Sequence, residues 1–111
     1  MKTKLVGFVV LAAMLFYSVT AQAQQYNRRV TIVNAASITM MYFYASNVDR
    51  TTWEEDILGT SVLPAGRSVV INIDDGSGYC LFDFRAVFAD GSEAIQYGVN
   101  VCEVATFTFT D

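Results

Sequence analysis

Apolar and polar residues alternate one by one over much of the chain after residue 28, most clearly near its end. There Phe107 and Phe109 alternate with Thr106, Thr108 and Thr110. Successive side chains of a β-strand point to opposite faces, so this segment is predicted to be a strand with one buried and one solvated face. No window shows a convincing helical period. The pattern therefore predicts an all-β domain.

Short runs rich in β-branched and aromatic residues are separated by turn residues throughout this region. Seven strands are expected, at residues 28–34, 38–45, 60–63, 68–73, 79–89, 93–101 and 104–110. There is no internal repeat, linker or low-complexity stretch. We expect one small antiparallel β-sandwich of about six to seven strands, occupying residues 24–111.

The strand at 79–89 is predicted to carry an aromatic core face formed by Phe82, Phe84 and Phe88, on the side of Cys80. Asp83 and Arg85 lie on the opposite face, where we expect an ion pair between them or with a neighbouring strand rather than a catalytic role.

Asp90-Gly91 is the strongest short hairpin signal in the chain. As a two-residue turn it places Ala89 opposite Ser92. The following strand then adds four residues to the face of the phenylalanines: Ile95, Tyr97, Val99 and Val101. A bulge at Gly98 would move the later pairs by one position and set Cys80 opposite Cys102.

Residues 39–44 are apolar on both faces. Such a strand is usually central, covered by the core on one side and here by the loop that carries Trp53 on the other. The alternative is an exposed patch that contacts a partner. Its candidate interaction residues are Met41, Phe43 and Trp53.

The first 23 residues have the organisation of a cleavable signal peptide. Lys2 and Lys4 precede an apolar stretch at residues 5–17, and Ala21-Gln22-Ala23 forms an A-x-A cleavage site. The apolar stretch is shorter than the roughly 20 residues that cross a bilayer. We expect export to the periplasm or the medium, cleavage after Ala23 and no membrane insertion afterwards.

Cleavage changes the charge, because both lysines leave with the signal peptide. The seven basic residues fall to five arginines against 11 acidic residues, so the net charge becomes −6. Nucleic acids and anionic membranes require a positive surface. The composition therefore argues against a nucleic-acid partner.

Cys80 and Cys102 are the two cysteines of the chain. In an oxidising compartment an even pair in a small domain indicates a disulfide. A redox or metal pair would need a close C-x-x-C spacing or histidine ligands, and the chain contains no histidine.

Alternating antiparallel strands would bring the 46–59 and 74–78 loops and the 102–104 corner to one end of the domain. That end would hold six carboxylates, which are candidate calcium ligands: Asp49, Glu54, Glu55, Asp56, Asp74 and Asp75. The 74–78 loop lacks the ligand spacing of an EF-hand. The alternative is a set of solvated turn residues, with Asp74 and Asp75 bonded to their own backbone.

Catalysis is not expected. The absence of histidine excludes Ser-His-Asp and Cys-His arrangements. A carboxylate pair of the glycosidase kind is compatible with the residue types, but a domain of this size offers little room for a substrate cleft.

Three segments together resemble a group of small exported bacterial proteins of unknown function. They are the 53–59 segment (Trp-Glu-Glu-Asp-Ile-Leu-Gly), the 63–66 turn (Leu-Pro-Ala-Gly), and residues 80–103 with their Asp-x-Arg, Asp-Gly and second-cysteine elements. The resemblance implies bacterial export and a shared compact β fold, and it brings no activity, ligand or site residue with it. We expect a secreted or periplasmic binding module for an envelope protein or polymer, with calcium as the only candidate cofactor. The alternatives are a structural envelope component or a small carboxylate-dependent hydrolase.

Overall fold

The computed structural model describes residues 26–111, and within this part the chain is all-β, as predicted. The six strands are β1 (Arg29–Asn34), β2 (Met40–Asn47), β3 (Ser68–Asn72), β4 (Leu81–Phe88), β5 (Glu93–Asn100) and β6 (Thr106–Phe109). No helix within the described residues is long and apolar enough to cross a membrane. The predicted signal peptide, residues 1–23, lies outside the described residues.

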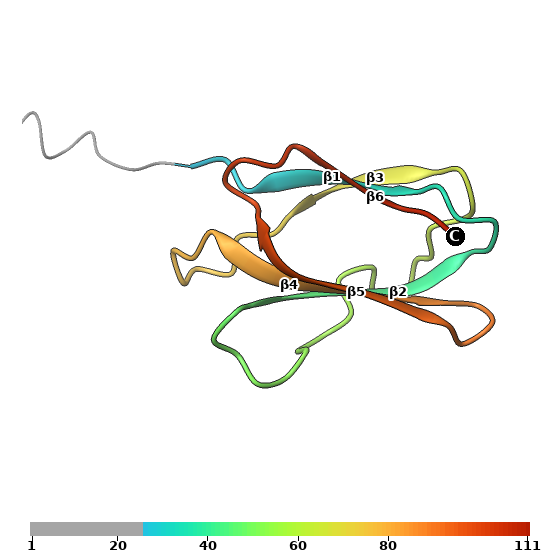
Figure 1. The fold of residues 1–111 in the computed structure, drawn as a ribbon, viewed down its shortest axis with the longest axis horizontal. Helices are drawn as coiled ribbons and strands as arrows, with labels where there is room; N and C mark the ends of the chain where they lie inside the picture. Colours follow the sequence, from blue (N-terminus) through green and yellow to red (C-terminus); the bar gives the residue numbers. More distant parts are fainter. Residues whose placement is uncertain (1–25) are drawn as a thin grey trace, which may run out of the picture.

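The strands form two three-stranded sheets that face each other (Figure 1). One sheet has the order β3-β1-β6 and the other the order β2-β4-β5. Three of the four strand pairings are antiparallel, and β1 pairs with β6 in parallel. The chain reaches this parallel neighbour only after passing through the whole second sheet. The fold is therefore a small β-sandwich with one parallel contact.

Aromatic side chains from both sheets fill the space between them. Phe43 of β2 packs edge-on against Phe84 of β4 and Phe109 of β6, with ring centroids 5.2 and 6.0 Å apart. Phe107 closes the group by packing against both Phe84 and Phe109. Edge-to-face pairs of this kind stabilise the core beyond the contribution of the apolar area that they bury. The predicted inward faces of β4 and β6 are confirmed.

The hairpin between β4 and β5 has a different register from the one predicted. Its loop has three residues, because the amide of Phe88 donates to the carbonyl oxygen of Ser92 and that of Gly91 donates to the carbonyl oxygen of Phe88. Gly91 has a φ of 86°, which suits the left-handed residue that ends a three-residue hairpin loop. Each β5 residue before the bulge therefore pairs one position away from its predicted partner.

This register explains which residues of β5 are buried. Before the bulge, Ala94 and Gln96 pair with the inward residues of β4, so Ile95 and Tyr97 point outward instead of into the core as predicted. The irregularity in pairing lies between Phe82 and Phe84 on the β4 side, which places the bulge at Tyr97 and Gly98 of β5. Beyond it Val99 and Val101 are buried, on the face that the unbulged register predicted for them and not the bulged one.

The strand predicted at 60–63 is reduced to a single bridge between Leu63 and Met40. The buried side chain of Asn34 explains how this segment is held, because its amide donates to the carbonyl oxygens of Ile38 and Leu63 at 2.9 Å each. Its side-chain oxygen accepts from the amide of Ala36 at 3.0 Å. One buried polar side chain thus satisfies the backbone of two turns.

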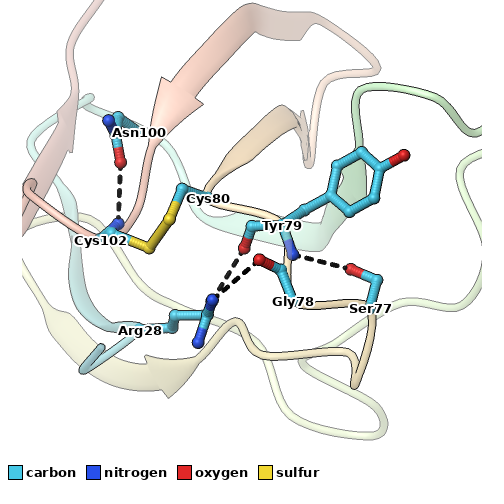
Figure 2. Close-up of a disulfide and its surroundings, with 7 residues drawn as sticks. All are labelled: Arg28, Ser77, Gly78, Tyr79, Cys80, Asn100 and Cys102. Atoms are coloured by element: carbon cyan, nitrogen blue, oxygen red, sulfur yellow. Dashed lines mark hydrogen bonds between the residues drawn. A yellow bond between two sulfur atoms is a disulfide. The ribbon is translucent and has the colours of Figure 1, made fainter. Parts of the chain in front are cut away.

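A disulfide joins Cys80 and Cys102, whose Cα atoms lie 5.3 Å apart (Figure 2). The cysteines lie just outside the paired strands, where the amide of Val101 donates to the carbonyl oxygen of Cys80 at 2.8 Å. Arg28 donates to the carbonyl oxygens of Tyr79 and Gly78 at 2.8 and 3.0 Å and so fastens the start of β1 to the same corner (Figure 2). The predicted disulfide is thus present. The strand register from which it was predicted, with Cys80 directly opposite Cys102, is not present.

Candidate functional site

The face of the β2-β4-β5 sheet that points away from the core is rich in aromatic and apolar side chains. We call this surface the tyrosine face. It is formed by Tyr42 and Tyr44 of β2, Val87 and Arg85 of β4, and Ile95 and Tyr97 of β5. Tyr42 is 45% exposed, Ile95 42% and Tyr97 67%. Single exposed apolar residues are ordinary, but several on one sheet face form a candidate contact surface.

A β-bulge near the start of β2 determines which of its aromatic residues join this face. The pairing with β4 shifts between Met40 and Tyr42, so Met41 is the extra residue. As a result Met40 and Phe43 both point into the core although they are three positions apart. Tyr42 and Tyr44 then point outward, and their rings are stacked with centroids 6.4 Å apart.

The predicted interaction residues are therefore redistributed. Phe43 is fully buried and belongs to the core, so it is not available to a partner. Met41 is half-buried at the bulge, and Trp53 is half-buried in the 46–59 loop. The prediction for Phe43 is wrong because a bulge breaks the strict alternation on which it rested.

Arg85 on the tyrosine face is paired with Glu93 of the neighbouring strand. The guanidinium group of Arg85 lies 5.2 Å from the ring centre of Tyr44 and donates to both carboxylate oxygens of Glu93, at 3.0 and 3.2 Å. This hydrogen bond lowers the pKa of Glu93 below its usual value. Arg85 thus has the partner on a neighbouring strand that the sequence predicted.

Asp83 has a different function from the predicted ion pair. Its Oδ1 accepts a hydrogen bond of 2.9 Å from the amide of Gly98, at the bulge of β5. Gly98 has a φ of 67°, a conformation that side-chain-bearing residues avoid. Asp83 therefore stabilises the backbone of β5 next to Tyr97.

A hollow of about 200 Å³ lies where the 46–59 loop meets the tyrosine face. The loop lies on the outer side of the β2-β4-β5 sheet (Figure 1, green). The wall formed by the loop contains Arg50, Thr52 and Trp53, and the wall formed by the sheet contains Ser46, Asp83 and Tyr97. The hollow thus combines two aromatic rings with hydrogen-bonding groups of both kinds.

Several contacts hold the loop in position above the sheet. The hydroxyl of Ser46 donates to the carbonyl oxygen of Thr52 at 3.0 Å, and Arg50 forms an exposed ion pair of 2.7 Å with Glu54. Among residues 26–111, Glu54 is the one non-glycine residue with a positive φ, 66°. A left-handed conformation costs such a residue about 1–2 kcal/mol, so the turn directly after Trp53 is strained.

Asp56 anchors the far end of the loop to the edge of β2. Its Oδ1 accepts from the amides of Phe43 and Leu58 at 2.9 and 3.1 Å, and the amide of Ile57 donates to the carbonyl oxygen of Phe43 at 2.8 Å. β2 is therefore an edge strand whose outer edge is covered by the loop, rather than the central strand that was expected.

The two acidic loops do meet at one end of the domain, as predicted. The hydroxyl of Tyr79 donates to Oδ2 of Asp49, and the amide group of Asn47 donates to Oδ2 of Asp75 at 3.0 Å. The contact with Asp49 raises the pKa of Tyr79. Burial acts to raise the pKa of Asp75, but hydrogen bonds from Ser77 and Asn47 outweigh it and lower that pKa.

The six carboxylates that were predicted to bind calcium are nevertheless not gathered around one point. Within the part of the chain that the structure describes, no group of three or more acidic, cysteine or histidine side chains has a geometry suited to a metal ion. Asp74 accepts from the amide of Gly76 at 3.0 Å, Glu54 pairs with Arg50, and Glu55 is exposed. Asp74 and Asp75 bond to the backbone of their own turn, the alternative that the sequence left open, and the other four carboxylates have separate surroundings.

A larger cavity of about 360 Å³ lies at the opposite end, between the β1–β2 and β4–β5 turns. Its polar groups already bond to one another: Asp111 accepts from the amide and hydroxyl of Ser37, and Asp90 accepts from those of Ser92. The hydrogen bonds from Ser92 lower the pKa of Asp90. The hollow beside Trp53 combines aromatic rings with both signs of charge and is the better candidate site.

Sequence reasoning did not identify Tyr42, Tyr44 and Tyr97 as surface residues. The one signal that would have found Tyr97 is the three-residue reading of the Asp90-Gly91 turn, which reverses the faces of the first half of β5. Comparison with protein-family models, with curated proteins and with solved structures found no match for this chain.

Proposed function

We propose that the chain is an exported, non-enzymatic binding module that contacts an envelope protein or polymer through the tyrosine face and the adjoining hollow. The single observation that carries this proposal is the exposure of Tyr42, Ile95 and Tyr97 on one face of one sheet. Tyrosine supplies a large contact area with little loss of conformational freedom, and it is enriched at binding surfaces.

Export is supported by the predicted signal peptide, by the resemblance to small exported bacterial proteins, and by the disulfide between Cys80 and Cys102. Disulfides persist in oxidising compartments such as the bacterial periplasm. The acidic composition disfavours nucleic acid as the partner.

Two alternatives have less support. A hydrolase would need a pair of carboxylates free to act on a substrate, but Asp83 of the hollow already accepts a backbone hydrogen bond and Glu93 is paired with Arg85. A purely structural envelope component would gain nothing from exposed tyrosines beside a loop with a strained residue.

The test compares three proteins for retention of material from an envelope extract: the wild type, the double variant Tyr42→Ala/Tyr97→Ala, and Val70→Ala. Val70 is a matched control, because it is 61% exposed on β3 of the other sheet. The wild type and Val70→Ala should retain the same component, and the double variant should lose it. Equal retention by all three would reject the tyrosine face as the contact surface.

A further inference from the structure

The hollow between Trp53 and Tyr97 has a lining that selects for one kind of ligand. It is small, about 200 Å³, and lies below the range of drug-sized pockets. It therefore suits a single compact group rather than a whole folded segment. We propose that this group is a sugar ring of a neutral polysaccharide, an inference that rests on the proposed binding function and specifies its ligand.

The charges around the hollow argue for a neutral ligand. Asp83 and Arg50 both line it, and Glu54 lies next to it through its ion pair with Arg50. Arg50 and Asp83 carry opposite charges, so a charged group in the hollow would gain one attraction and meet one repulsion, and it would also lose its own hydration. An uncharged ligand avoids this loss of hydration and still finds a donor and an acceptor.

The mixture of aromatic and polar groups then favours a sugar over an apolar side chain. A pyranose ring has faces of C–H bonds that pack on aromatic rings, and a rim of hydroxyl groups that both donate and accept. Trp53 and Tyr97 supply the rings, while Oδ2 of Asp83 and the N–H groups of Arg50 that do not contact Glu54 supply polar partners. An apolar side chain would displace the water that bonds to these polar atoms and would offer no hydrogen bond in its place, which is costly.

The tyrosine face extends the site in one direction and so favours a polymer. Ser46, Tyr44 and Tyr42 alternate along the outer face of β2, opposite Asp83, Arg85 and Val87 of β4. Residues two apart on a strand are separated by about 6.5–7 Å. A chain with one unit in the hollow would thus pass over the stacked rings of Tyr44 and Tyr42. We expect affinity to rise with oligosaccharide length.

The probes are soluble neutral polysaccharides, namely a β-glucan, a mannan, a galactomannan and a xylan, together with their oligosaccharides of increasing length. An anionic polymer, polygalacturonate, is the comparison. Binding is measured by affinity electrophoresis and titration calorimetry with the purified protein, its disulfide intact. At least one neutral polymer should bind, and polygalacturonate should not.

Variants then locate the site. Trp53→Ala or Tyr97→Ala should weaken binding about 10-fold or more, the loss of a central aromatic contact. Tyr42→Ala should weaken binding of long but not short oligosaccharides, and Val70→Ala should leave both unchanged. Near-ultraviolet circular dichroism of each variant establishes that it is folded. For a Trp53→Ala protein that does not fold, Trp53→Phe serves instead, and it should retain most of the affinity.

Three results would overturn the inference: no neutral polymer binds, only polygalacturonate binds, or binding survives both pocket substitutions. The proposed function fails separately, when Tyr42→Ala/Tyr97→Ala retains the same envelope component as the wild type. If the double variant loses a protein component and no glycan binds to the wild type, the proposed binding function stands and the sugar ligand is rejected.

Discussion

Asp83 accepts a hydrogen bond from the amide of Gly98, 15 residues further along the chain, and this contact holds the bulge of β5. The bulge reverses the side-chain faces of β5, so Tyr97 lies on the surface while Val99 lies in the core. The same short stretch therefore contributes both to the candidate site and to the stability of the sandwich.

Substitution of Gly98 tests the bulge directly. Gly98 has a φ of 67°, and no atom lies within 4 Å of the position that a Cβ would take, so the cost of Gly98→Ala is conformational and not steric. We expect a loss of about 1–2 kcal/mol in the free energy of unfolding, measured in denaturant. Gly98→Asn should lose less, because asparagine tolerates the left-handed region better. Equal losses for both variants would argue against a left-handed residue here.

The disulfide is expected to contribute strongly to stability because the domain is small. Cys80→Ser or Cys102→Ser should lower the free energy of unfolding by about 2–5 kcal/mol, the usual cost in a small secreted domain. The double substitution should cost no more than either single one, since each removes the same bond. Titration of the native wild-type protein that finds two reactive thiols would contradict the bond itself.

The contact between Arg85 and Glu93 predicts a dependence of stability on acidity. The Arg85 hydrogen bond lowers the pKa of Glu93 below its usual 4.5. Because the pKa of Glu93 is lower in the folded state than in the unfolded state, ionisation of Glu93 stabilises the fold. This contribution is complete at a pH above the unfolded-state pKa, and it is lost as the pH falls through the folded-state pKa. Carboxyl-carbon NMR should show that Arg85→Gln raises the pKa of Glu93 toward 4.5. The pKa of Asp90, which Ser92 lowers, should stay unchanged in the same variant; a parallel rise at Asp90 would point to a general charge effect.

Calcium is expected to act on this domain as an ordinary salt. Asp74 and Asp75 accept hydrogen bonds within their own turn, and the six candidate carboxylates do not converge on one point. The melting temperature in calcium should therefore match that in sodium chloride of equal ionic strength, and Asp74→Asn/Asp75→Asn should not change the comparison. A bound cation would instead stabilise by RT ln(1 + [L]/Kd), and a rise with calcium that EDTA reverses would restore the cation site.

Much of the fold was predictable because alternation is a local property of the sequence. The strands at β1, β4 and β6 and their core phenylalanines follow from it directly. The site was less predictable, because its residues depend on two bulges. Asp-Gly suits both a two-residue and a three-residue hairpin loop, and the choice between them reverses the face of Tyr97. The bulge at Met41 likewise decides between Phe43 and Tyr42 as the exposed ring, and no residue type in that apolar run marks it.

The parallel contact between β1 and β6 has a consequence for the order in which the protein folds. Thr31 pairs with Thr106, so the first sheet is completed by residues 75 positions apart. Closing so long a loop costs entropy before any contact compensates for it, whereas β4 and β5 meet across a three-residue loop. We expect the β4–β5 hairpin to form early and β1 to gain its second neighbour last. During synthesis from the first residue onward, Phe107 and Phe109 are among the last residues made, so Val30 and Ile32 stay without this part of the core until the chain is nearly complete.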